Sequence, residues 1–231
     1  MADGPDEAEA IRRTFVARDM QATPPWVAAA SRILTAERWA RTLELVRSEI
    51  PNSQNPPIID VGCGSGLDIE FWHDAGWPAD QLAGIDLVET RVDAARVRNP
   101  GVDIRVGTDV SLPFADGAFS VATAATVFSS IPSSAARATM FAEMERIVRP
   151  GGLVVIYDFV IRNPRNSRVV AMSSDRLIEL AGRSPNGSFP VSALLYVVGP
   201  AALIHHRLGQ AIARVAPRTH RISFWRVRPV G

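Results

Sequence analysis

The sequence contains a single cysteine, Cys63, in 231 residues. One thiol cannot form an internal disulfide or a multi-cysteine metal site, and such sparse usage is typical of a reducing compartment. No uninterrupted apolar run approaches the length of a bilayer span, and the acidic N-terminal segment lacks the basic and apolar parts of an export signal. We therefore expect a cytoplasmic protein without membrane insertion.

The chain also lacks a charge of one dominant sign. Its 25 Lys and Arg nearly balance 24 Asp and Glu, for a net charge of +1, so no global field indicates nucleic acid as a partner. A small-molecule partner fits better, and a homodimer stays open. Residues 205–228 are locally basic, which predicts either a solvated face or an anion-binding patch.

Metal-ligand patterns are missing as well. The four histidines show no ligand spacing with acids or with the cysteine, so we predict no metal site, although a magnesium ion held by carboxylates stays open. The histidines are His73, His205, His206 and His220.

Short apolar runs alternate with helical patterns along most of the chain. Residues 1–50 are interpreted as an N-terminal helical extension, interrupted by Pro24 and Pro25, and residues 51–231 as one compact domain with it. The predicted strands are 58–61, 82–85, 102–106, 119–125, 153–159, 189–198 and 220–227, and the predicted helices of the domain are 66–75, 89–98, 134–148, 168–181 and 201–215. This alternation predicts an α/β fold with a mostly parallel seven-stranded sheet and helices on both faces.

The segment Asp60-Val-Gly62-Cys-Gly64-Ser-Gly66 lies between the first predicted strand and a helix. Glycines at a helix start let the backbone turn sharply and approach a ligand, although a tight structural turn needs glycine too. The next strand ends at Asp86, 20 residues after Gly66, where a carboxylate can accept both ribose hydroxyls of an adenosine. The conjunction predicts a nucleoside cofactor.

These residues resemble the class I S-adenosylmethionine-dependent methyltransferases, whose fold is Rossmann-like, over about residues 58–159. The resemblance is carried by four motifs in order: Ile58-Ile-Asp-Val-Gly-Cys-Gly-Ser-Gly66, Leu82-Ala-Gly-Ile-Asp86-Leu, Asp109-Val-Ser-Leu-Pro-Phe-Ala-Asp-Gly-Ala-Phe119 and Arg149-Pro-Gly-Gly152-Leu-Val-Val-Ile-Tyr-Asp158. The resemblance implies S-adenosylmethionine as cofactor. It implies contacts from Asp60, Gly62, Cys63, Gly64, Gly66, Asp86, Leu87, Asp109 and Val110.

Within this set, the resemblance gives each residue a part of the cofactor. The glycines shape the methionine side, Asp60 faces the amino group, Asp86 holds the ribose, and Asp109 with Val110 flanks the adenine. One departure concerns Asp109, because the family's acid stands four residues before Leu-Pro-Phe, where this chain has Thr108.

Two other functions are compatible with the glycine-rich turn. A nicotinamide-dependent oxidoreductase would have its third glycine at the position of Leu67 instead of Gly66. A noncatalytic subunit that binds the cofactor is the second alternative, and the intact glycines with Asp86 argue against a lost site. Cys63 is interpreted as a motif residue rather than a nucleophile, since no histidine lies near it in the sequence.

The acceptor side is less clearly marked. Asp158 ends the fifth strand at the edge of the sheet where ligands of open α/β folds bind, so we predict it as the catalytic base or as an anchor for the acceptor, against the alternative of a helix or loop cap. It precedes Arg162, Asn163, Arg165 and Asn166, which suit a sugar, carboxylate or phosphate group.

The C-terminal pattern resembles a bacterial branch found with surface-polysaccharide and other small-molecule biosynthesis. The pattern comprises Asn163-Pro-Arg-Asn166, Val197-Val-Gly-Pro-Ala-Ala-Leu203 and Arg218-Thr-His220. This resemblance implies methylation of a hydroxyl of a sugar, glycoside or related metabolite. N- or C-methylation of a secondary metabolite is the alternative.

Overall fold

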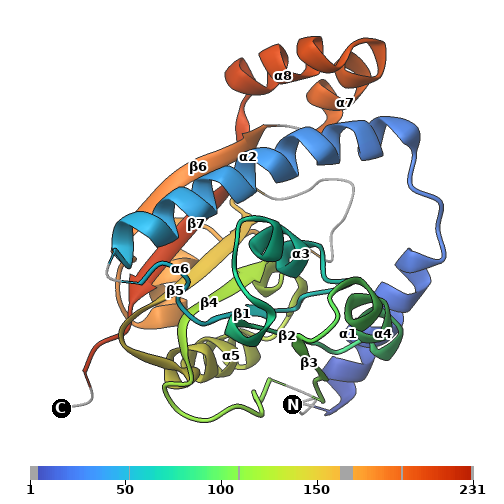
Figure 1. The fold of residues 1–231 in the computed structure, drawn as a ribbon. Coiled ribbons are helices and arrows are strands. Elements are labelled where there is room, and N and C mark those ends of the chain that lie inside the picture. Colours follow the sequence, from blue (N-terminus) through green and yellow to red (C-terminus); the bar gives the residue numbers. More distant parts are fainter. Residues whose placement is uncertain (1–4, 52, 109, 162–168, 194, 230–231) are drawn as a thin grey trace.

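The computed structural model describes residues 5–51, 53–108, 110–161, 169–193 and 195–229. Seven strands form one sheet in the order β3-β2-β1-β4-β5-β7-β6 (Figure 1). The strands are β1 Ile58–Val61, β2 Leu82–Asp86, β3 Asp103–Val106, β4 Phe119–Ala125, β5 Val148–Phe159, β6 Gly187–Ala193 and β7 Arg218–Arg226. The first five are parallel neighbours, and β7 runs antiparallel to β5 and β6, which confirms the predicted mostly parallel sheet.

Helices cover both faces of this sheet, as predicted. They are α1 Pro5–Asp19, α2 Pro25–Glu49, α3 Leu67–Asp74, α4 Glu89–Arg98, α5 Ser134–Ile147, α6 Ser174–Ala181, α7 Leu195–Ile204 and α8 His206–Val215, with short 3₁₀ helices at Ala79–Gln81 and Phe128–Ser130. One core packs α5 and α6 against one face of the sheet. The other core packs α2, α3 and α4 against the opposite face.

The boundary between these two cores follows the alternation of side chains along each strand. In β5, Val154 and Ile156 belong to the α5 side, whereas Leu153 and Val155 belong to the α2 and α3 side. Successive side chains of a strand point to opposite faces. The same alternation decides which residues at the end of β5 reach a ligand site.

The N-terminal extension consists of two helices, α1 and α2. The second of them packs against helices from the C-terminal part of the chain. Pro25 begins α2, where a proline costs nothing because its missing N–H would be unpaired at that position. Ala30, Ile33 and Leu34 of α2 pack against Val198 and Ala213 of α7 and α8. The division of the chain at residue 50 stays a prediction.

Four predicted elements differ clearly from the structure. The strand predicted over 189–198 ends at Ala193, and the run from Leu195 is helical; apolar runs without periodicity fit a buried strand or a helix. The helix predicted over 201–215 is divided, because His205 caps α8 by accepting from the Arg207 N–H at 3.2 Å. The strand predicted over 153–159 begins earlier, at Val148, and the helix predicted over 168–181 begins later, at Ser174.

Candidate active site

Two cavities lie at the carboxyl ends of the central parallel strands. The first measures about 380 Å³ and is lined by residues of β2, α1, α5 and the loop after β3. The second measures about 1120 Å³ and is lined by residues of α2, the glycine-rich turn, β5, α7 and β7. Gly62, Arg91, Ala125 and Thr126 line both, so the two cavities adjoin. One extended ligand can occupy parts of both.

The three glycines of the turn have left-handed backbone angles for different reasons. Their φ values are +73° for Gly62, +53° for Gly64 and +81° for Gly66. A Cβ on Gly62 would overlap Val127, and a Cβ on Gly66 would overlap Asn99, so packing restricts both positions. A Cβ on Gly64 would meet no protein atom within 4 Å, and Gly64 lines the second cavity. Gly64 is therefore the glycine that leaves room for a ligand.

Asp86 lies in the first cavity with both carboxylate oxygens already oriented by the backbone. Oδ2 accepts from the Gly64 N–H and Oδ1 from the Val88 N–H, each at 2.9 Å. A carboxylate oxygen has two lone pairs, so each oxygen retains capacity for one further donor. This arrangement suits a pair of vicinal hydroxyls, as predicted for a ribose.

Beyond Asp86, the first cavity is mainly apolar. Leu87, Val88 and Val110 line it together with Leu112. Such a lining suits a flat apolar ring rather than a charged group. The structure thus brings Leu87 and Val110 together with Asp86, whereas the predicted contact Asp109 lies outside the described residues.

Helix α1 covers the first cavity, a role that the sequence did not reveal. Ala8, Ile11 and Phe15 contribute to its lining. Arg12 holds the helix in place by donating from Nε to the Leu87 carbonyl at 3.0 Å. These residues lie three and four positions apart, a spacing that indicates an apolar helix face but does not tell whether that face meets a core or a ligand.

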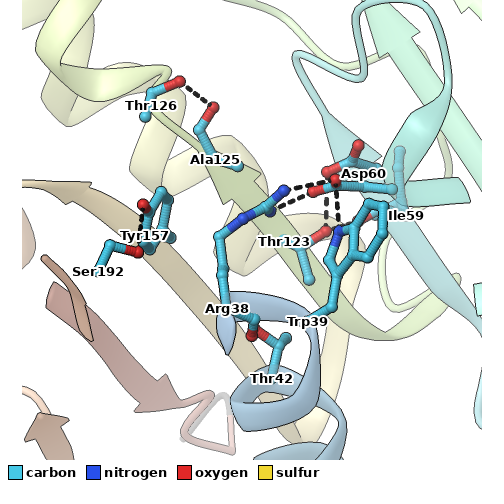
Figure 2. Close-up of polar contacts among 11 residues, drawn as sticks. Arg38, Trp39, Thr42, Ile59, Asp60, Thr123, Ala125, Thr126, Tyr157 and Ser192 are labelled. Atoms are coloured by element: carbon cyan, nitrogen blue, oxygen red, sulfur yellow. Dashed lines mark hydrogen bonds and ion pairs between the residues drawn. The ribbon is translucent and has the colours of Figure 1, made fainter. Parts of the chain in front are cut away.

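A buried ionic network lies under the methionine side of the predicted site (Figure 2). Arg38 donates from both terminal nitrogens to the Asp68 carboxylate, at 2.7 Å for Nη2 to Oδ1, and Trp39 donates to the same carboxylate at 2.8 Å. Asp60 accepts from the Thr123 hydroxyl at 2.9 Å. Asp60, Asp68 and Arg38 all line the second cavity. The link between α2 and α3 spans 30 residues, so no local motif indicates it.

The electrostatics of this network favour a cationic ligand. Burial, and next the charge of Asp68, hold the pKa of Asp60 well above its usual range. Arg38 compensates Asp68 and lowers the pKa of that second carboxyl, although burial acts in the opposite direction. Asp60 thus carries the less favoured negative charge, and a positive group in the second cavity would stabilise it. Its position agrees with the predicted contact to an amino group.

Thr126 occupies a strained position where the two cavities meet. Its φ of +58° is unusual for a β-branched residue. The strain is held by hydrogen bonds: the Thr126 N–H donates to the Tyr157 carbonyl at 2.7 Å, and the Ser130 hydroxyl donates to the Thr126 carbonyl at 3.0 Å. Strained residues cluster at ligand sites because the surrounding structure over-determines them.

Cys63 lines the second cavity and is buried. Burial and the nearby Asp60 and Asp86 raise the pKa of its thiol. The thiol therefore stays protonated at neutral pH and is a poor nucleophile. This agrees with the interpretation of Cys63 as a motif residue.

The structure does not bring Asp158 into either cavity. Its side chain is 2% exposed, and its carboxylate accepts from the Ser129 N–H at 2.9 Å and from its neighbour Phe159 at 2.8 Å. Tyr157 and Phe159 line the second cavity instead, because alternation turns Asp158 to the opposite face of β5. Asp158 thus fits the alternative reading of a cap, and it holds the 3₁₀ helix Phe128–Ser130. The neighbouring residues 162–168 lie outside the described part of the chain.

A tyrosine and a histidine that the sequence analysis did not assign stand at the second cavity. Tyr157 and His220 stack with ring centroids 4.9 Å apart and an interplanar angle of 1°. Burial lowers the pKa of His220 to about 4 and raises that of Tyr157 to about 12. Both side chains are therefore neutral at pH 7 and can exchange hydrogen bonds with a neutral ligand.

A hydrogen bond to Thr219 bears on which ring nitrogen of His220 is protonated. Thr219 Oγ1 lies 3.3 Å from the Ser192 carbonyl and 2.9 Å from His220 Nδ1, and its single hydrogen goes to only one of them. When the hydroxyl donates to Ser192, it accepts from Nδ1–H, and Nε2 then keeps a lone pair. A neutral imidazole in this tautomer can accept a proton.

Metal sites and membrane spans are the other types of feature to consider in the described residues. In this part of the chain, no group of three or more His, Cys, Asp and Glu side chains is arranged to hold a metal ion. Within the same residues, no helix combines the length and the apolar character that crossing a bilayer would require.

Comparisons with known proteins agree with the geometry. Residues 59–156 match the family model described as "Methyltransferase domain". The chain is 30% identical over 131 residues to methyltransferase GfsG of Streptomyces halstedii, covering 55% of this chain and 46% of that protein. It is 28% identical over 124 residues to the demethylmenaquinone methyltransferase of Renibacterium salmoninarum, covering 53% and 48%. The chain thus spans less than half the length of these relatives.

Among solved structures, a similar fold occurs in geranyl diphosphate C-methyltransferase from Streptomyces coelicolor A3(2). The TM-score is 0.65 with 15% sequence identity, and the superposition covers 96% of this chain and 98% of the other. At this identity the likeness concerns the fold alone.

Proposed function

We propose that this chain is a class I S-adenosylmethionine-dependent methyltransferase, as the match of residues 59–156 to a methyltransferase domain supports, and that it methylates a small-molecule acceptor bound in the second cavity. The observation that carries the proposal is the shape of the site. The glycine-rich turn with Asp86 and the stacked Tyr157 and His220 line adjoining cavities that share Gly62 and Thr126.

The cofactor of this family is S-adenosylmethionine, and the described residues fit it. Asp86 offers two oriented acceptors for the ribose, and the apolar first cavity suits the adenine. Asp60 suits the amino group of the methionine part, and the open space at Gly64 accommodates its chain. When bound, the cofactor supplies an electrophilic methyl group on a sulfonium.

Within the second cavity, His220 is proposed as the base. A hydroxyl acceptor loses its proton during methyl transfer, and Nε2 of a neutral His220 can take that proton. Tyr157 fixes the imidazole by stacking and is itself held by its hydroxyl, which donates to Ser192 at 2.9 Å. In the proposed tautomer, Thr219 donates to the Ser192 carbonyl and accepts from Nδ1–H of His220. In this proposal, His220 takes the role of the catalytic base that the sequence led us to expect of Asp158.

The proposed acceptor is a hydroxyl of a sugar, glycoside or related metabolite. The second cavity is large enough for the methionine part of the cofactor and an acceptor besides. Its lining includes the hydroxyls of Ser31, Thr35 and Thr90, which suit a polyhydroxylated ligand. Phe159 and Leu195 would pack against an apolar part of a glycoside.

The test is a transfer assay with S-adenosylmethionine labelled in the methyl group and a panel of glycosides, followed by mass analysis of the product. We expect label in a methyl ether. The variant His220→Asn should lower kcat by about 10²–10⁴, the usual share of a general base, with little change in cofactor affinity. If turnover with the same acceptor stays near wild type, His220 is not the base.

C-methylation of an apolar acceptor is the second candidate. It is favoured by the aromatic and aliphatic wall of Phe159, Ile161, Leu195 and Tyr196. It is also favoured by the similarity to a demethylmenaquinone methyltransferase. NMR of the labelled product distinguishes the candidates, because a methyl on oxygen and a methyl on carbon have widely separated carbon shifts.

A further inference from the structure

Helix α7 exposes a face built from apolar side chains. The exposed apolar residues lie three or four positions apart along the helix, so they share one face. They are Val197, Pro200, Leu203 and Ile204, of which Ile204 is 79% exposed. The opposite face is buried against α2, where a Cβ on Gly199 would overlap Trp26. Exposed apolar residues that occur singly need no explanation, but a contiguous helical face does.

Helix α8 packs against α7 and has an exposed apolar stripe of its own, with positive charge beside it. Leu208 and Val215 are exposed on one stripe of α8, while Arg207 and Arg214 lie on the adjoining stripe. Gly209 and Ala213 form the buried stripe against α7 and α2. The outer surface of α8 is thus divided into an apolar and a cationic strip, the pattern of helices that lie at a membrane surface.

The C-terminal part of the chain, which includes α7 and α8, carries charge of one sign. The sequence has no Asp or Glu between residues 180 and 231. Among the described residues, no salt bridge involves Arg207 or Arg214, whereas Arg218 and Arg226 pair with Glu37 and Glu49 of α2. The two arginines beside the apolar face thus keep their charge available for an external partner.

The helical hairpin formed by α7 and α8 also reaches the second cavity, where the acceptor is proposed to bind. Leu195 and Tyr196 at the start of α7 line the second cavity, and Tyr196 lies against Trp26 of α2 with ring centroids 5.3 Å apart. In Figure 1, α7 and α8 lie beyond α2, at the outer edge of the molecule. A partner that binds the outer side of α7 and α8 would therefore lie close to the second cavity.

We propose that the α7–α8 face docks on an anionic phospholipid membrane. This face comprises Val197, Pro200, Leu203, Ile204, Leu208 and Val215 with Arg207 and Arg214 beside them. The apolar side chains enter the boundary between headgroups and acyl chains, and the arginines contact lipid phosphates. Peripheral docking of this kind needs no membrane-spanning helix.

The charge distribution argues against a second copy of the chain as the occupant. In a two-fold interface the same patch lies on both sides, so Arg207 and Arg214 of both copies would lie in an interface to which α7 and α8 contribute no acidic residue. Like charges across an interface oppose association. An anionic lipid surface complements both the apolar and the cationic strip.

The test is sedimentation of the full chain with phosphatidylcholine vesicles and with vesicles of equal parts phosphatidylcholine and phosphatidylglycerol. We expect binding to the anionic vesicles that weakens with salt, and much weaker binding to phosphatidylcholine alone. Arg207→Gln with Arg214→Gln should weaken binding roughly 25-fold, about fivefold for each charge. Leu203→Ser with Ile204→Ser should weaken it about tenfold or more.

Matched controls are Val97→Ser, an exposed apolar residue of α4, and Arg149→Gln, an exposed arginine of β5. Both should bind as wild type, and circular dichroism verifies that every variant is folded. The proposal is overturned if wild type does not sediment with anionic vesicles, or if the hairpin variants bind as well as the controls. It is also overturned if light scattering finds a dimer that Leu203→Ser with Ile204→Ser dissociates. The assay needs neither cofactor nor acceptor, so its outcome is independent of the proposed function.

Discussion

Gly64→Val separates the ligand role of the glycine-rich turn from its structural role. The residue has φ +53°, and a Cβ there meets no protein atom within 4 Å. The folded protein therefore loses only the cost of a left-handed residue, about 1–2 kcal/mol. In the complex, the added side chain competes with the ligand for the same space, and overpacking of this kind costs about 1–3 kcal/mol. Affinity for S-adenosylhomocysteine should fall roughly 5- to 150-fold.

A matched control is available at the end of α6. Gly182 has φ +63°, and a Cβ there also meets nothing within 4 Å, but it lines neither cavity. Gly182→Val should therefore lose a similar stability in urea unfolding and keep wild-type affinity in calorimetry. If the two variants bind S-adenosylhomocysteine equally well, the ligand does not occupy the open space at Gly64, and this prediction is refuted.

Three further predictions concern the acceptor side and the core. Turnover should stay flat from neutral pH down to about pH 5 and fall through about pH 4, because burial keeps His220 neutral until then; an acidic limb near 6.5 would contradict this. Tyr157→Phe should keep the stacking on His220 but leave Ser192 without its donor, so stability should fall by about 1 kcal/mol in urea unfolding while affinity for the cofactor product is unchanged in calorimetry. Burial raises the pKa of Asp158 to about 6, so the folded state binds its proton more tightly than the unfolded state, and that stability is lost as pH rises from about 4 to about 6. Asp158→Asn should remove this pH dependence and lower turnover less than tenfold, whereas a loss of about 10²–10⁴ would restore Asp158 as the base.

The sheet could be predicted because each of its strands is marked locally. The run Ile58–Val61 precedes a glycine-rich turn, and Leu82–Asp86 ends at an acid, so the mostly parallel direction follows from the chain, whereas the order of the strands was not predicted. Helix α7 could not be predicted in this way. Its apolar run has no clear period. The helix packs closely through Gly199 on Trp26, which lies 173 positions earlier in the chain (199 − 26), so the contact has no local signal.

The cofactor side of the site was predictable for the same reason as the sheet, since Gly64 and Asp86 lie at the ends of neighbouring strands. The acceptor side depends on segments far apart in the sequence. His220 meets Tyr157 only because β7 pairs antiparallel with β5. The sequence places Tyr157 and Asp158 equally close to the sheet edge, and only the fold decides which of the two faces the cavity.

The most direct test of the central claim is calorimetric titration of the chain with S-adenosylhomocysteine, with NAD as the comparison ligand. The account predicts one binding site, no comparable binding of NAD, and a loss of about 1.5–3 kcal/mol in Asp86→Ala, the range for a hydrogen bond to a charged group, because the ribose loses its carboxylate acceptor. Circular dichroism of that variant verifies the fold, since Asp86 also accepts from Gly64 and Val88. Unchanged affinity in folded Asp86→Ala, or preference for NAD, would contradict the account.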